Sequence, residues 1–134
     1  MHPMYQKADA LFADVLDAAS YVEKVLGIGL LEKVYQFCLT KELRYRGHEV
    51  EREVRVKVAY RGESEEMDLR VDLLVDKCLI VELKSMTGAI RLEYIAQTLS
   101  YMRMLNIPLA LIYNYGPTTA DRAKRVILSG ADEP

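Results

Sequence analysis

The chain has 134 residues, of which 51% are hydrophobic and 28% charged, and its formal net charge at pH 7 is −2. These values predict one folded domain, residues 1–134, with a real hydrophobic core, and they exclude a disordered tail. The slightly negative net charge excludes a protein that coats nucleic acid by charge alone. It still allows binding through a local basic patch, above all where a metal ion neutralises acidic residues.

The sequence contains no signal for a membrane or for export. No apolar run approaches the roughly 20 residues that cross a bilayer, and the N-terminal MHPMYQK lacks the apolar core of a signal peptide. We therefore expect a cytoplasmic protein without membrane contact. Cys38 and Cys78 lie in apolar stretches, which indicates buried free thiols. His2 and His48 stand alone, so a zinc site of Cys and His is not expected.

Two helices are predicted in the first third of the chain. Apolar residues recur at helical spacing from about residue 8 to residue 26, and the run Gly27-Ile28-Gly29 interrupts them. A second helix is predicted from about residue 30 to residue 46, and Gly47 is placed to end it.

The hydrophobic period then changes from that of a helix to that of a strand. Alternation over residues 54–60 predicts a half-buried strand, and residues 61–66 are predicted to form a polar turn. Residues 67–75 and 78–84 are predicted to form two further strands around Asp76-Lys77.

The last part of the chain adds a helix over about residues 91–105 and a buried strand over residues 109–114. Residues 122–128 are predicted to form either an edge strand or a last helical turn. The order helix, helix, three strands, helix, strand predicts an α/β fold, in which helices flank a mixed sheet.

Charged residues interrupt the two middle strands, where burial of a charge costs several kcal/mol unless a partner compensates it. If residues 76–78 form a three-residue loop, Asp72 lies opposite Glu82, and Arg70 opposite Lys84, while the other face of both strands is wholly apolar. A two-residue loop would put the two acids on opposite faces. The apolar pattern favours the three-residue loop.

Two carboxylates about 4 Å apart repel by several kcal/mol at an effective dielectric near 20. A divalent cation relieves this repulsion, and hard oxygen ligands suit Mg²⁺ or Mn²⁺. Lys84 projects from the same face as Glu82, two residues away. The alternative is an ordinary ion pair of Glu82 and Lys84 at a sheet edge, joined by Asp72. The placement of the acids in adjacent apolar strands favours the metal site.

A third acid, Glu32, lies near the start of the second predicted helix, and Tyr35 follows on the same helix face. An acid in a first helical turn is also favoured by the helix dipole alone, so Glu32 is either a site residue or a helix-start residue. Tyr35 is a candidate substrate contact or a core residue.

The segment GLLEKVY, residues 29–35, resembles the motif that names the GxxExxY proteins, a branch of the PD-(D/E)XK nuclease superfamily. The resemblance continues through KELRYRG, RVDLLV, IVELK, AQTLSY and LIYNYG at residues 41–47, 70–75, 80–84, 96–101 and 111–116. It covers most of the chain, and the order and spacing of the pieces are more specific than any piece alone.

The resemblance implies a restriction-endonuclease-like αβββαβ core, to which the first predicted helix is an addition. It implies that Asp72, Glu82 and the Leu83 carbonyl hold Mg²⁺ or Mn²⁺, and that Lys84 is the lysine of the motif. Glu32 matches the helix acid that supports the metal or an attacking water in related nucleases. The motif differs at one place, since Val71 stands where the literal motif has proline.

Gln97 and Tyr101 resemble the QxxxY element of RecB-like nucleases, which touches substrate. The alternatives are an exposed helix position for Gln97 and a core aromatic for Tyr101. The function implied is metal-dependent hydrolysis of phosphodiester bonds in nucleic acid, with DNA as the expected substrate. A catalytically silent module that binds nucleic acid or a protein, and a structural subunit of a larger assembly, are the alternatives. Sequence specificity would need a partner or a homodimer.

Overall fold

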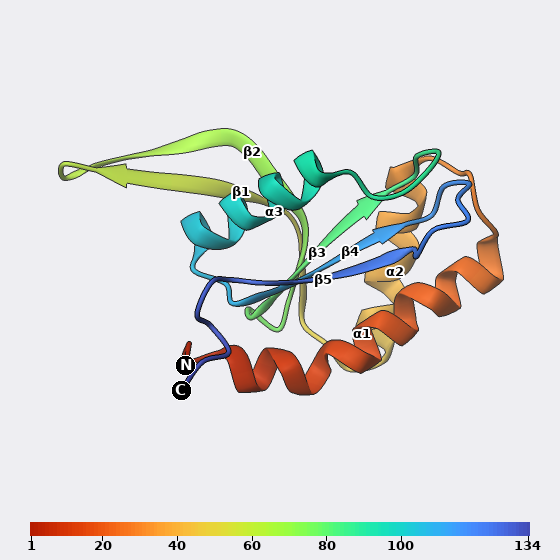
Figure 1. Ribbon diagram of the computed structural model, residues 1–134, viewed down its shortest axis with the longest axis horizontal. Helices are drawn as coiled ribbons and strands as arrows, with labels where there is room; N and C mark the ends of the chain where they lie inside the picture. The colour runs from red at the N-terminus through yellow and green to blue at the C-terminus, as the bar shows by residue number, and fades with distance from the viewer.

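The computed structural model describes residues 1–134 as a five-stranded mixed sheet with helices on both faces (Figure 1). The helices are α1 (Tyr5–Leu26), α2 (Glu32–Tyr45) and α3 (Leu92–Leu105). The strands are β1 (Val50–Tyr60), β2 (Glu63–Val75), β3 (Leu79–Lys84), β4 (Leu109–Asn114) and β5 (Ala123–Ile127). They lie in the order β1-β2-β3-β4-β5, and only β3 and β4 are parallel.

The element order is the one predicted from the sequence, and residues 122–128 contain an edge strand rather than a helical turn. The predicted polar turn over residues 61–66 is wrong in length. Only Arg61 and Gly62 form the turn, both with positive φ (51° and 80°), and the next four residues continue β2. A two-residue hairpin turn of this kind suits the twist of the strands, and polar residues can extend the ladder where neither face is buried.

The two faces of the sheet carry separate hydrophobic cores. The residues of β2 and β3 that were predicted to share an apolar face pack together under α1 and α2, in a core cluster of 19 buried residues. The opposite face forms a cluster of 10 buried residues, among them Ile80, Ile112 and Met102 of α3. Glu82 alternates with Val81 and Leu83 of the first cluster, so it belongs to the α3 side together with Ile80. In β2 the alternation is interrupted at Asp72, because Val71 and Leu74 both pack on the α3 side.

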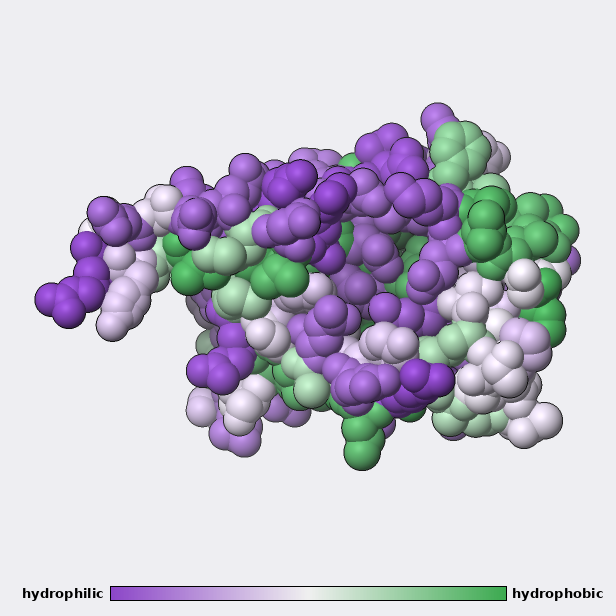
Figure 2. Space-filling view, turned by 90° about the horizontal axis from the view of Figure 1, so that it is seen from above, coloured by the Kyte–Doolittle hydropathy of each residue, from purple (hydrophilic) through white to green (hydrophobic).

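The β1–β2 hairpin projects from the body of the molecule (Figure 1). We call residues 57–66 the hairpin arm. The register between the strands shifts between Arg55 and Lys57, and Glu53 adopts a positive φ of 49°. Such irregularities increase strand twist, which directs the arm away from the sheet. Figure 2 shows the arm as a hydrophilic projection.

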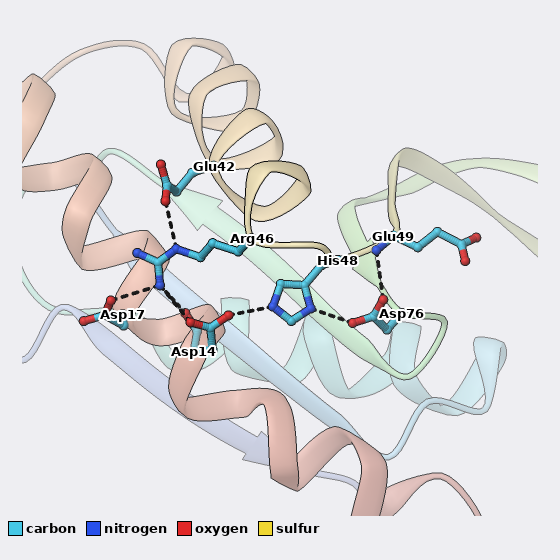
Figure 3. Close-up of polar contacts among 7 residues, drawn as sticks. All are labelled: Asp14, Asp17, Glu42, Arg46, His48, Glu49 and Asp76. Carbon is cyan, nitrogen blue, oxygen red and sulfur yellow. Dashed lines mark hydrogen bonds and ion pairs between the residues drawn. The ribbon is translucent and has the colours of Figure 1, made fainter.

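A polar cluster joins three elements on the outer side of the molecule (Figure 3). The His48 ring nitrogens lie 2.7 Å from carboxylate oxygens of Asp14 on α1 and Asp76 in the β2–β3 turn. Because a carboxylate only accepts hydrogen bonds, this geometry fits an imidazolium that donates from both nitrogens. The Arg46 guanidinium, at the end of α2, adds ion pairs to three acids, Asp14, Asp17 and Glu42. The cluster thus ties α1, the end of α2 and the β2–β3 turn together.

Both cysteines are free thiols, as expected, but only Cys78 is buried and Cys38 is half-buried. None of the helices combines the length and apolar character required for a bilayer span. The cytoplasmic location stays a prediction.

Candidate active site

The β2–β3 hairpin has the three-residue loop that the apolar pattern predicted. Val75 pairs with Leu79 and Leu73 with Val81, so residues 76–78 form the loop. Asp76 and Lys77 have positive φ values of 49° and 59°, which make the tight turn. Continued along the strands, this register places Asp72 opposite Glu82.

The two strands separate at these acids, and the carboxylates bridge the gap. The Glu82 Oε1 atom accepts a hydrogen bond from the Asp72 N–H at 3.0 Å, and the Asp72 Oδ2 atom accepts one from the Leu83 N–H at 2.7 Å. Regular pairing ends at Leu73–Val81. The expected pairing of Arg70 opposite Lys84 therefore does not form, because the strands have diverged. Arg70 is exposed and makes ion pairs with two acids, Glu53 and Asp68.

Each carboxylate keeps one oxygen for another ligand. The second oxygens of Asp72 and Glu82 take part in no hydrogen bond of the structure, and no fully buried side-chain oxygen lacks a partner. Both free oxygens therefore reach solvent, although the Glu82 side chain is buried and only 5% of the residue is exposed. Two free acidic oxygens from residues that face each other can receive a cation.

Burial and mutual repulsion disfavour ionisation of both acids. Burial raises the pKa of Glu82 to about 8, with a further contribution from the Asp72 charge. Burial also raises the pKa of Asp72, although the Leu83 N–H opposes this shift. A cation bound between the two carboxylates would favour their ionised forms and so lower both pKa values.

The backbone supplies a third oxygen between the strands. The N–H and C=O of one strand residue point to the same side, and neighbouring residues alternate. The Lys84 carbonyl accepts a hydrogen bond from the Tyr115 N–H, beyond the end of β4, and the Leu83 N–H binds Asp72 of β2. The Leu83 carbonyl therefore faces the gap that the two carboxylates occupy.

The Lys84 ammonium lies 4.3 Å from the centroid of the Tyr94 ring, on the first turns of α3. The lysine charge lowers the pKa of both Asp72 and Glu82, although burial outweighs this effect in each case. Lys84 is thus held beside the pair by a cation–π contact. The sequence carries no signal for the contribution of Tyr94, because a tyrosine at this helix position also fits an ordinary surface.

Glu32 lies at the rim of the site. It is the first residue of α2 and is exposed, and its charge contributes to the raised pKa values of Asp72 and Glu82. The structure contains no group of three or more His, Cys, Asp or Glu side chains that could hold one metal ion. Glu32 is therefore a neighbour of the two-acid pair rather than a third member of it.

Tyr101 and Gln97 lie on α3, which covers this face. Tyr101 is 5% exposed; burial raises the pKa of its hydroxyl, and the charges of Glu82 and Asp72 raise it further. The ring therefore packs in the core while its hydroxyl approaches the acids. Gln97 lies one helical turn earlier and is exposed.

The sequence comparison places this arrangement in a known family. The sequence model of the PD-(D/E)XK nuclease superfamily matches residues 9–126. The chain belongs to this superfamily. The expected restriction-endonuclease-like fold is thereby confirmed, with α1 added before the αβββαβ core. Asp72 and the triplet Glu82-Leu83-Lys84 stand in the order of the superfamily's name.

A comparison with solved structures adds the fold alone. The crystal structure of SSO0001 aligns with a TM-score of 0.54 and 13% sequence identity, over 95% of this chain and 62% of that chain. This chain thus spans less than two thirds of the neighbour's length. None of the curated proteins compared matches its sequence significantly.

The donor set of this PD-(D/E)XK domain fits a hard divalent cation. Two carboxylates and one backbone carbonyl offer only oxygen atoms, which Mg²⁺ and Mn²⁺ prefer, and the remaining ligand positions open to solvent. No cysteine or histidine contributes, so a soft-metal site does not fit.

Tyr35 does not lie on a surface that substrate could reach. Its side chain is fully buried and its ring stacks on Tyr115, with ring centroids 3.9 Å apart. Its hydroxyl donates to the Gly27 carbonyl at 2.7 Å and accepts from the Leu30 N–H at 3.1 Å. The expected substrate contact is corrected to a structural role: Tyr35 holds the loop that precedes Glu32. A tyrosine side chain on the surface could not make these contacts.

Asn114, at the end of β4, is a structural residue that was not predicted from the sequence. Its side chain is fully buried, and its Oδ1 atom accepts from the backbone N–H of Met86 and Gly116 while its Nδ2 donates to the carbonyls of Met86 and Gly88. The only signal in the sequence was a polar residue at the end of a buried strand, within the run LIYN.

Proposed function

We propose that this protein is a metal-dependent nuclease that hydrolyses phosphodiester bonds of nucleic acid, with DNA as the expected substrate. The observation that carries the proposal is the juxtaposition of Asp72 and Glu82 between separated strands, each with one oxygen free, and with Lys84 alongside. Membership of the PD-(D/E)XK superfamily supports the reaction class. The low net charge of −2 agrees with a site that needs a cation before it accepts phosphate.

In this proposal Asp72, Glu82 and the Leu83 carbonyl hold Mg²⁺ or Mn²⁺. The ion, when bound, polarises the scissile phosphate and lowers the pKa of a water ligand. Lys84 stabilises the charge that develops on the phosphate oxygens, from the position that Tyr94 gives it. Glu32 at the rim orients water, and Gln97 and the Tyr101 hydroxyl contact substrate from α3.

We further propose that the chain is a GxxExxY protein, because the structure gives a physical reason for the motif. Gly29 adopts a φ of 87°, which favours glycine. Tyr35 reaches back along the helix to fix the Gly27–Leu30 loop. Together the two residues determine where α2 begins, and so where Glu32 stands relative to the acid pair.

The test is a cleavage assay on single- and double-stranded DNA and RNA with Mg²⁺, with Mn²⁺ and with EDTA. Asp72→Asn, Glu82→Gln and Lys84→Met should each reduce the rate at least about 100-fold, since each removes a charge used in the transition state. Glu65→Gln in the hairpin arm is the matched control and should cleave like wild type. Circular dichroism and thermal unfolding establish that each variant is folded.

Metal-independent cleavage, or full activity in the folded Asp72→Asn and Glu82→Gln variants, would contradict the proposal. Nucleic-acid binding without cleavage, unchanged by Mg²⁺ and by both substitutions, would instead support the catalytically silent module.

A further inference from the structure

Three loops meet at the end of the sheet where β3 and β4 finish, at the right of Figure 1. They are residues 27–31, residues 85–91 and residues 115–122. Between them lies an open hollow of about 670 Å³, lined by eight residues of which none is charged. This volume is within the usual range for a small organic ligand, about 300–1,000 Å³.

Buried hydrogen bonds hold the walls of the hollow in place. The Asn114 side chain binds the 85–91 loop at Met86 and Gly88, and the Gly88 N–H donates to the Pro117 carbonyl at 2.9 Å. A side chain at Gly116 would meet the Met86 carbonyl oxygen at 2.0 Å, so only glycine permits this close approach. These two loops therefore form one rigid wall.

The third loop is fixed to the same framework. The Ser85 hydroxyl donates to the Leu30 carbonyl at 2.6 Å, and the Gly29 N–H donates to the Tyr115 carbonyl at 2.9 Å. With Tyr35 holding the loop from below, the hollow is formed before any ligand binds, which is typical of a binding site.

Two segments of the chain connect the hollow to the proposed active site. Strand β3 ends at Lys84, and the chain then enters the wall at Thr87 and Ala89. On the other side, Ile28 lines the hollow and the same loop leads to Glu32. Figure 2 shows apolar side chains gathered at one end of the face that also carries the hydrophilic arm.

The chemistry of the lining selects a neutral, flat and partly polar group. The exposed Thr87 and Thr119 side chains offer hydroxyls that can bind the edge of a ring, while the exposed Ile28 offers an apolar contact to its face. The absence of a cation from the lining disfavours a phosphate. A nucleobase has these features, and the chain segments that line the hollow lead to Lys84 and Glu32 of the proposed active site.

We propose that this hollow binds an unpaired nucleobase next to the scissile phosphate. A base inside a duplex is stacked and cannot enter, so the substrate is cut at a nucleotide outside a duplex, in a single strand or at a frayed end. The inference rests on the proposed nuclease function for the position of the cut, but base binding itself can be measured without cleavage.

The direct test is a methyl NMR titration of the wild-type protein without divalent cation. Adenosine should shift the Ile28 methyl signals, and inorganic phosphate should not. In Ala89→Trp the indole fills the hollow and should abolish the adenosine shifts, whereas Ala13→Trp on the exposed side of α1 should preserve them. Shifts of Ile28 with phosphate alone, or adenosine shifts that survive in folded Ala89→Trp, would overturn the inference.

A second measurement uses labelled oligonucleotides in the Glu82→Gln background, where cleavage should be at least about 100-fold slower. Ala89→Trp should weaken binding of a single strand about tenfold, equivalent to about 1.4 kcal/mol, and should leave binding of the blunt duplex of the same sequence unchanged. Equal affinity with and without the added tryptophan would count against the hollow while leaving the nuclease proposal intact. Adenosine binding by a protein that never cleaves nucleic acid would support base binding in the hollow and contradict the nuclease proposal.

Discussion

Asp72 and Glu82 perform two tasks in the protein without a metal ion. Their oxygens accept backbone N–H groups that the separated strands would otherwise leave without partners, and their free oxygens point to solvent. The first task stabilises the gap between β2 and β3. The second leaves two repelling acids together, with the pKa of Glu82 raised to about 8 by burial and by Asp72. The pair therefore favours ligand binding at a cost in stability.

This conflict predicts that Glu82→Gln stabilises the protein while it removes metal binding. The amide keeps an oxygen for the Asp72 N–H but cannot repel Asp72, so at pH 8 in EDTA the free energy of unfolding should rise by about 1–2 kcal/mol. Mg²⁺ should raise the melting temperature of wild type and not of the variant. Urea unfolding and calorimetry provide the measurements, and a less stable Glu82→Gln protein would contradict the account.

A second residue-scale prediction concerns Asn114. Asn114→Asp retains the shape but cannot donate to the carbonyls of Met86 and Gly88, and it introduces a charge in a fully buried position. We expect a loss of about 3–5 kcal/mol in the free energy of unfolding at pH 7. Asn106→Asp, at an exposed helix end, is the control and should change stability little. Equal unfolding midpoints in the two variants would show that the loops do not depend on Asn114.

The sequence could predict some of these residues and not others. The sequence predicted that Asp72 lies opposite Glu82. The reason is that only a loop with an odd number of residues puts all the apolar residues of the two strands on one face. The bonds from each carboxylate to the neighbouring backbone did not follow, since parity cannot show where strands separate. Burial of Tyr35 and the contacts of Asn114 depend on residues distant in the chain, Tyr115 and Met86, so local patterns hold no information about them.

Among the elements, α1 and the β2–β3 turn are linked by one histidine. Burial alone would lower the pKa of His48, but its hydrogen bonds to Asp14 and Asp76 outweigh burial and raise it. Asp17 and Arg46 face the same cluster, and the Lys7 ammonium binds the Asp76 carbonyl at 3.1 Å. The charged imidazolium thus holds the turn that sets the Asp72–Glu82 register.

His48 should therefore stabilise the fold in a pH-dependent way. Since its folded pKa lies above the unfolded value of 6.5, its contribution is complete below pH 6.5 and is lost as pH rises through the folded pKa. His48→Gln should cost about 1–2 kcal/mol in urea unfolding at pH 6 and much less at pH 9. The contributions of Asp14 and Asp76 to stability have the opposite pH dependence. Because the pKa values of these two acids are lowered, their contributions are present at higher pH and are lost as pH falls through the folded pKa values.

The control for this experiment is His2→Gln, which removes the other histidine of the chain. It should show no comparable change between pH 6 and pH 9. A cost of His48→Gln that is the same at both pH values would indicate packing rather than charge.

The sequence predicted the helices and strands well where the apolar pattern was strong. The predicted boundaries were wrong where this pattern was absent. The buried strands β3 and β4 and all three helices were expected from their periodicity. The turn after β1 was predicted too long, because residues 63–66 are polar on both faces and resemble a loop. Beyond Val58 the backbone ladder alone maintains the strands of the hairpin arm, up to the last pair, Tyr60–Glu63.

At the scale of the whole molecule, the tip of the arm, residues 59–64, lies outside both hydrophobic cores. The last residues toward the tip that belong to a core or pack against it are Val56 and the partly buried Val58. Replacement of residues 59–64 by Asn-Gly should retain the pairing of Val58 with Glu65 in a two-residue turn. We expect the free energy of unfolding to change by less than about 1 kcal/mol in urea. Loss of cooperative unfolding would show that the arm is part of the folding unit.

The two ends of the chain lie side by side, at the opposite end of the molecule from the three loops (Figure 1). The His2 N–H donates to the Ala131 carbonyl at 2.9 Å, so a few flexible residues can join the termini without strain. The order of the elements along the chain can therefore be changed while their packing is kept. A circular permutant that opens between Arg61 and Gly62, at the tip of the arm, should fold to the same sheet and leave the acid pair and the hollow untouched.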